Sequence, residues 1–259
     1  MNDHTKFTSQ RAGNHLLSFG EFAAMYLLTW NSQNWPDIIR QANDLSTSNN
    51  KIGDHEDVYR KQLDHLKHAY HALPKVMRVL ANIPTYMIFD DHDITDDWNI
   101  TKEWHNNVKN SDCGKQIVCN GLAAFWTFQG WGNNPDLYSQ EFIDKITGYL
   151  QRDGKANDAE TITFEDYLWN FHGWSFSVPA NPLSIFLDCR TQRGYNTPMG
   201  APDLISEEAL ESILHIAQQG NYDTGDRIIM ISPTPVFGFE LEEKLQDTWL
   251  IYLALIIGI

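Results

Sequence analysis

Residues 84–99 read PTYMIFDDHDITDDWN, an apolar, β-prone run that leads directly into a group of carboxylates around one histidine. Residues 86–89 have the composition of a short buried strand, and Pro84 precedes them. The acidic side chains follow at once and are Asp90, Asp91, Asp93, Asp96 and Asp97. Ionised carboxylates packed this closely repel one another unless a cation lies among them. The stretch therefore indicates a strand that ends in a metal-binding loop.

Two interpretations of this acidic loop stay open. Aspartates are common in loops and caps, so residues 90–97 could be a solvated segment that caps the next helix. Oxygen ligands beside an imidazole, in contrast, suit a divalent or trivalent metal ion. Ligands of open α/β sheets gather at the carboxyl ends of strands, and Asp90 directly follows the apolar run. Its position favours the metal site.

The composition restricts the class of protein and of partner. A chain of 259 residues with 12% aromatics can form one large α/β domain or two small ones with a packed core. A formal charge of −15 argues against nucleic acid or an anionic membrane surface as a partner, because both would repel the chain. The three cysteines, Cys113, Cys119 and Cys189, match no disulfide or zinc spacing, and the N-terminus lacks an apolar signal segment. We therefore expect a reducing compartment, the cytoplasm.

Apolar periodicity predicts a helix-rich first part followed by alternating strands and helices. Helices are expected after a capping box at residues 18–21, over 59–73, after Pro74, over 116–128 and 138–150, and from 163 onward. Strands are expected at 174–178, 183–187 and 227–231, with a helix over 206–220 before the last strand. This order predicts an α/β fold with a helical elaboration.

Three of the expected strands end in polar loops, at residues 90–97, 188–193 and 232–234. If these strands are parallel, their carboxyl ends share one edge of the sheet and the loops converge. In such an arrangement Arg190 and Arg193 could each bind a phosphate or carboxylate through paired hydrogen bonds.

The same residues have simpler explanations. The two arginines could pair with Asp188 or with glutamates, as surface arginines often do. His92 is the candidate proton donor to a leaving alkoxide, although a lone histidine is more often structural. The chain contains no GxxxxGK, GxGxxG, GxSxG or HExxH motif, which removes the main support for four common enzyme classes.

Residues 85–98, TYMIFDDHDITDDW, closely resemble the DDHE/DDHD segment of the PhoD-like (alkaline phosphatase D) metallophosphatases. Residues 14–22, 187–193 and 232–238 are similar to further segments of that family, so the resemblance covers most of residues 14–246. The family belongs to the calcineurin-like phosphoesterases, which have a two-metal site inside a β-sandwich flanked by helices. The resemblance implies a hydrolase that cleaves phosphomonoesters or phosphodiesters with metal-activated hydroxide.

The resemblance also implies roles for individual residues. Asp91 takes the place of a metal ligand and His92 that of the catalytic histidine, while Asp90 is a neighbouring or alternative ligand. We expect Arg190 to contact the phosphate of a small-molecule phosphoester. The implied cofactors are divalent or trivalent ions, namely Fe, Ca, Mn or Zn.

Two motifs of the family have no match in this chain. The first metal motif is expected before residue 14 and the last one after residue 246. We therefore expect residues 1–246 to be a partial metallophosphatase domain and residues 247–259 to be a non-native or truncated tail. Residues 249–259 are apolar but fall short of the roughly 20 residues that span a bilayer. The alternative function is an inactive fragment or a non-catalytic binding module that keeps the centre of the fold.

Overall fold

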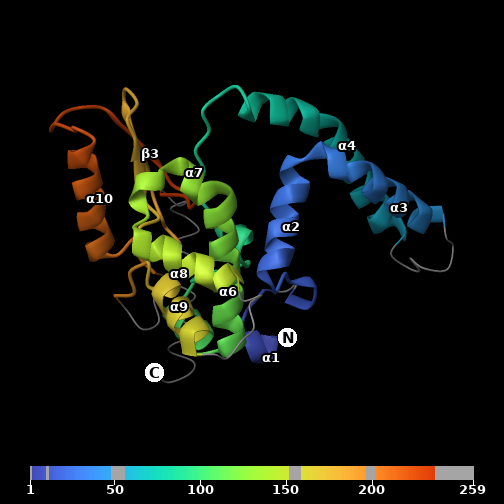
Figure 1. Cartoon of the computed structure of the whole chain (residues 1–259), viewed down its shortest axis with the longest axis horizontal. Coiled ribbons are helices and arrows are strands. Elements are labelled where there is room, and N and C mark those ends of the chain that lie inside the picture. Colours follow the sequence, from blue (N-terminus) through green and yellow to red (C-terminus); the bar gives the residue numbers. More distant parts are fainter. Residues whose placement is uncertain (1, 10–11, 48–55, 152–158, 197–201, 237–259) are drawn as a thin grey trace, which may run out of the picture. The chain divides into compact units, whose positions relative to one another are not determined.

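The computed structural model describes residues 2–9, 12–47, 56–151, 159–196 and 202–236, and the chain divides into two compact units (Figure 1). Unit 1 comprises Met1–Met87, Asp93–Asp97 and Asn106–Phe171, and unit 2 comprises Ile88–His92, Trp98–His105 and His172–Ile259. The acidic stretch is thus divided between the two units. The tail at residues 247–259 lies outside the described residues.

The regular secondary structure of the described residues of unit 1 is all helical. Its helices are α1 (Asn2–Thr5), α2 (Phe19–Trp30), α3 (Trp35–Thr47), α4 (Glu56–Leu80), α6 (Asp112–Phe125), α7 (Trp131–Asn133), α8 (Gln140–Gln151) and α9 (Ala159–Trp169). Helix α5 (Lys102–Lys109) crosses the division between the units. Short 3-10 turns occupy Ala12–Asn14, Ser32–Asn34 and Pro135–Leu137. The predicted helix-rich first part is confirmed.

Helix α6 is the centre of unit 1. It packs against α1, α2 and α9, and Figure 1 shows it between α2 on one side and the α8–α9 pair on the other. Every residue from Gly114 to Phe125 except Gln116 is buried, as its nearly continuous apolar sequence predicts. The helix continues into a π-helical turn, Trp126–Gly130. Gly121 allows close packing here, since a Cβ at this position would lie 2.6 Å from Ile94 Cδ1.

The capping box at the start of α2 is confirmed. Ser18 Oγ accepts a hydrogen bond from the Glu21 amide at 3.3 Å, and Glu21 Oε2 accepts one from the Ser18 amide at 2.8 Å. The amides of Ser18 and Leu17, which both donate to Glu21 Oε2, lower the pKa of the Glu21 carboxyl. The local sequence therefore determines where this helix begins.

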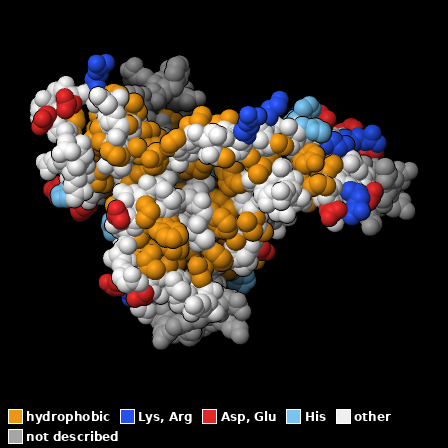
Figure 2. Space-filling model, turned by 45° about the horizontal axis from the view of Figure 1, so that its top comes forward, with side chains coloured by type: hydrophobic (Ala, Val, Ile, Leu, Met, Phe, Trp, Pro, Cys, Tyr) orange, Lys and Arg blue, Asp and Glu red, His pale blue; other side chains and the backbone are white. Residues whose placement is uncertain are grey.

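The predicted break at Pro74 is wrong. Helix α4 runs without interruption from Glu56 to Leu80 with Pro74 inside it, although proline lacks the amide that would bond to the preceding turn. Leu63 and Leu73 are buried before the proline, and Met77 Sδ after it accepts a hydrogen bond from the Ser32 amide at 3.4 Å, so contacts on both sides of Pro74 favour continuation. Most Lys and Arg side chains on the face drawn in Figure 2 lie over α3 and α4. None of the described helices is long and apolar enough to cross a membrane.

Unit 2 contains a three-stranded mixed sheet with strand order β1-β2-β3. Strand β1 (Phe176–Val178) pairs with β2 (Leu183–Phe186) in antiparallel fashion, and β2 pairs with β3 (Ile228–Ile231) in parallel. Helix α10 (Glu207–Gln219) connects the two parallel strands and packs against β1 and β2. The strands and the helix lie where the sequence predicts them, and the mixed α/β class is confirmed.

Two features of the expected sheet structure differ in the described residues. The strands of the described residues form one sheet, and the second sheet of a β-sandwich is not found among these residues. Residues 84–90 have no regular secondary structure, so the strand predicted at residues 86–89 is wrong. The reason is a contact with a residue 46 positions away: the Asn133 side chain donates to the Met87 carbonyl at 2.6 Å and accepts from the Met87 amide at 3.1 Å. A side-chain amide thus satisfies groups that a neighbouring strand would have bonded.

Candidate functional site

A buried aromatic cluster fixes the start of the acidic segment in unit 2. Phe89 has no exposed surface, and its ring centroid lies 5.3 Å from that of Trp98 and 5.7 Å from that of Trp174. Asp90 and Asp91 follow directly, and Asp91 begins a short 3-10 turn that ends at Asp93. Burial of Phe89 therefore sets where the two carboxylates leave the core.

The loop after β2 is organised by Asp188, which is buried. Its Oδ1 accepts hydrogen bonds from the amides of Arg190 at 3.0 Å and Thr191 at 2.8 Å, and its Oδ2 accepts one from Thr191 Oγ1. The Asp188 amide in turn donates to Ser175 Oγ at 3.0 Å. Burial raises the pKa of Asp188, and these hydrogen bonds oppose the rise. Such side-chain to backbone bonds hold a tight turn after the strand.

Asn99 holds the backbone carbonyl of Arg190 in place. Its side-chain amide donates to the Arg190 carbonyl at 2.9 Å, and its Oδ1 lies 3.2 Å from Nδ1 of His105. The Asn99 backbone carbonyl accepts a hydrogen bond from the Tyr195 hydroxyl at 3.0 Å. Asn99 is buried and has φ of +56°, a left-handed conformation that asparagine tolerates better than most residues. Both backbone polar groups of Arg190 are thus bonded.

The Arg190 guanidinium joins the two loops. Its Nε donates to Asp90 Oδ1 at 3.0 Å, and its Nη2 donates both to that same oxygen and to Asp91 Oδ1 at 3.1 Å. The side chains of Arg190 and Asp91 are only 10% and 14% exposed, against 42% for Asp90. Low exposure strengthens a charged pair relative to one in water. The structure therefore brings together three of the four predicted site residues around one cationic group.

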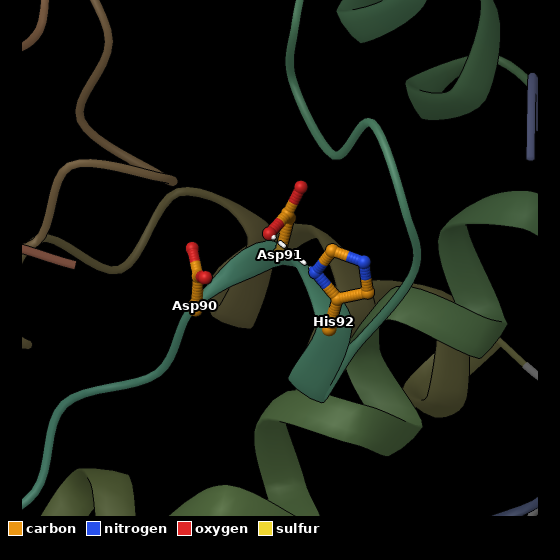
Figure 3. Close-up of side chains that lie close together, drawn as sticks. All are labelled: Asp90, Asp91 and His92. Carbon is orange, nitrogen blue, oxygen red and sulfur yellow. Dashed lines mark hydrogen bonds and ion pairs between the residues drawn. The ribbon is translucent and has the colours of Figure 1, made fainter. Parts of the chain in front are cut away.

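His92 completes the predicted set at the edge of this cluster. Its Nδ1 lies 3.0 Å from Asp91 Oδ1, and its side chain is 75% exposed. Figure 3 shows its ring turned toward Asp91, with Asp91 between Asp90 and His92 in this view. Burial alone raises the pKa of the Asp91 carboxyl, but the Arg190 guanidinium and His92 outweigh it and hold that pKa below its ordinary value.

Asp90, Asp91 and His92 could hold one metal ion among the described residues. A ligand atom of each lies within 4.8 Å of the other two. Two carboxylates with one imidazole are donors that suit Fe, Mn or Zn, so the chemistry of the set fits a single cation. The Oδ1 atoms of both carboxylates, however, already accept hydrogen bonds from Arg190. Any metal at this position competes with an arginine of the same chain.

The other acidic residues of the stretch are in unit 1 and have different neighbours. Asp97 Oδ2 accepts a hydrogen bond from Thr8 Oγ1 at 3.3 Å. Asp93 lies close enough to Tyr26 to contribute to the raised pKa of that phenol, after burial. Asp93 and Asp97 thus have neighbours in unit 1, whereas Asp90 and Asp91 contact Arg190 in unit 2.

The loops after β2 and β3 converge as predicted, because these strands are parallel. The Leu187 amide donates to the Ile231 carbonyl at 2.9 Å, and Cys189 Sγ lies 3.3 Å from Ser232 Oγ. Arg193 Nε donates to the Cys189 carbonyl at 3.0 Å. Burial and the charge of Arg190 lower the pKa of Arg193, and the charge of Asp91 acts in the opposite direction. The alternative pairing of Arg190 with the Asp188 carboxylate is also corrected: that carboxylate bonds the arginine's backbone amide, not its guanidinium.

Asn99 and Ser175 are parts of the site that the sequence did not predict. Neither has a charge or a motif, and each acts by bonding a backbone group of the loop after β2. The only signal was the position of Asn99 at the end of the acidic stretch.

Two cavities of about 430 and 450 Å³ are described in unit 1, and neither is lined by Asp90, Asp91, His92 or Arg190.

Comparison of the chain with protein-family models, with curated proteins and with solved structures found no match.

Proposed function

We propose that the chain is part of a metal-dependent phosphoesterase that hydrolyses small-molecule phosphomonoesters or phosphodiesters. The single observation that carries this proposal is the meeting of Asp90 and Asp91 with Arg190, residues that lie 100 and 99 positions apart in the sequence. Carboxylates for a cation and an arginine for a phosphate are the groups that phosphoryl chemistry needs. The resemblance of residues 85–98 to the PhoD-like metallophosphatases supports the same assignment.

The proposal gives each residue a definite role. Asp91 and Asp90 would hold a divalent or trivalent cation, which supplies Lewis acidity and lowers the pKa of a bound water molecule. His92 is exposed and is oriented by Asp91, so its imidazolium can donate a proton to a leaving alkoxide. Arg190 would steady the phosphate with its planar guanidinium. In this proposal β1–β3 are part of a metallophosphatase-type β-sandwich.

A reducing compartment, the cytoplasm, is the proposed location. The three cysteines are free, and Cys119 and Cys189 are buried. Thiols that serve as core residues are typical of proteins kept in reducing surroundings.

A second candidate function is a binding module without catalysis, or an inactive fragment. The observation that favours it is again Arg190, which already neutralises much of the charge of Asp90 and Asp91. Such a centre maintains the loop arrangement with no bound metal.

The test is hydrolysis of a chromogenic phosphoester by the chain, with and without Mn²⁺, in the wild type and in Asp91→Ala and His92→Ala. The control is Asp64→Asn, which removes an exposed carboxylate on α4. The proposal predicts metal-dependent turnover that falls by about 100-fold or more in both site variants and is unchanged in the control. Equal turnover in wild type and both site variants, or none in the wild type, would reject it, and the latter would favour the binding module.

A further inference from the structure

One oxygen of each carboxylate that a metal would use is already hydrogen-bonded to a cation of the chain. Asp90 Oδ1 accepts from both Nε and Nη2 of Arg190, and Asp91 Oδ1 accepts from Nη2 at 3.1 Å. The Arg190 side chain is 10% exposed and that of Asp91 is 14% exposed, so the contact between these two side chains is mostly shielded from water. A cation placed on the same oxygens would lie within a few ångströms of a fixed positive charge.

We propose that Arg190 is the resident counter-ion of Asp90 and Asp91, and that a metal ion binds this pair only when the guanidinium leaves it. The inference rests on the proposed function, because it concerns the same carboxylates. It adds a regulatory property: the metal affinity of the site is set by an arginine from the loop after β2.

The backbone geometry allows this exchange without unfolding the loop. The Arg190 amide is bonded to Asp188 Oδ1 at 3.0 Å and the Arg190 carbonyl to the Asn99 side chain at 2.9 Å. Neither bond involves the guanidinium, so rotation of the arginine side chain leaves both in place. The released guanidinium keeps the planar donor pattern that fits a phosphate. Cation binding would therefore convert a carboxylate-bound arginine into one available to an anionic substrate.

The experiment is calorimetric titration of Mn²⁺ into the full chain, comparing the wild type with Arg190→Gln. The matched control is Arg60→Gln, which removes the same charge from an exposed helix pair with Glu56. We expect Arg190→Gln to bind Mn²⁺ at least about tenfold more tightly than the wild type, because the competing charge is gone. The control should bind like the wild type. Adding Asp91→Asn to Arg190→Gln should abolish the gain, which places the ion at this pair.

A second variant covers the case in which Arg190→Gln does not fold. Arg190→Lys keeps the charge but loses the fork that bridges both carboxylates, so its Mn²⁺ affinity should still exceed that of the wild type. Melting followed by circular dichroism adds an independent readout, since Mn²⁺ should raise the melting temperature of Arg190→Gln more than that of the wild type.

The outcomes separate the two proposals. Equal Mn²⁺ affinity in wild type and folded Arg190 variants would overturn the counter-ion inference and leave the metal site standing. Weaker binding in those variants would also overturn it, because the arginine would then be shown to position the ligands. Absence of Mn²⁺ binding in every protein, the Arg190 variants included, would overturn both proposals.

Discussion

Replacing Asn99 by alanine should destabilise unit 2 although the residue carries no charge and no chemistry. The substitution removes the hydrogen bond to the carbonyl of the buried Arg190, and an unsatisfied buried acceptor costs about 1–3 kcal/mol. It also places alanine at φ of +56°, which costs about 1 kcal/mol more than asparagine there. The sum is about 2–4 kcal/mol of the free energy of unfolding.

The assay is urea unfolding of the full chain followed by tryptophan fluorescence, since Trp98 and Trp174 lie in the buried cluster of the same unit. With an m value of about 2–3 kcal/mol/M, the midpoint should fall by about 1 M. Asn221→Ala is the matched control, because Asn221 is exposed and has φ of +58°. It should show the backbone cost alone, about 1 kcal/mol. If the two alanine variants lose equal stability, the hydrogen bond to Arg190 contributes nothing and the reasoning fails.

Three further predictions concern unit 1 and are checked by the same unfolding assay. Gly114→Ala should lower the free energy of unfolding by several kcal/mol, because the added methyl group would overlap a carbonyl oxygen of α1. Gly148→Ala is the control: it has open space around it and should stabilise α8 by about 0.5–1 kcal/mol. A Gly114→Ala variant as stable as the wild type would contradict the packing of α1 against α6. Burial raises the pKa of Glu165 from 4.5 to about 7, so the folded state binds its proton more tightly and stability should fall as pH rises from about 4.5 through 7. Glu165→Gln should remove that decline, up to about 3 kcal/mol, and an unchanged pH profile would refute the assignment. Asn133→Ala should cost about 1–3 kcal/mol through the loss of both bonds to the Met87 backbone, and a neutral effect would show that water replaces them.

Elements determined by local sequence could be predicted, whereas those determined by distant contacts could not. The Ser18–Glu21 capping box needs only four consecutive residues, and its geometry is as the pattern indicates. The strands at residues 183–186 and 228–231 follow from short apolar runs with a helix between them. The apolar run at residues 86–89 has the same composition, but a side-chain amide 46 positions away bonds its backbone in place of a strand. Local propensity carries no information about that partner.

The candidate site shows the same division. The sequence indicated Asp90, Asp91, His92 and Arg190 by residue type and by resemblance, and the structure places the first two against the guanidinium of the last. The convergence of the loops after β2 and β3 could be predicted because parallel strands share an edge. The assignment of residues 93–97 to unit 1 could not be predicted, because a run of aspartates gives no information about which neighbour each side chain contacts.

The acidic pair connects these observations to function. Two adjacent carboxylates next to a buried core require a positive charge, and the sequence alone suggested a metal ion as its source. Arg190 supplies that charge from within the chain, so the pair does not depend on a metal for neutralisation. Removing one partner of a poorly exposed ion pair lowers the free energy of unfolding by more than the intact pair adds to it, because the other charge is left without compensation. A metal that displaces Arg190 must therefore compensate the charge of both carboxylates itself. The displaced guanidinium then needs another anion, and its planar donors fit a phosphate as they fit a carboxylate. Under the proposed function, cation and phosphate binding would therefore favour each other, because each stabilises the arrangement in which Arg190 has left the two carboxylates.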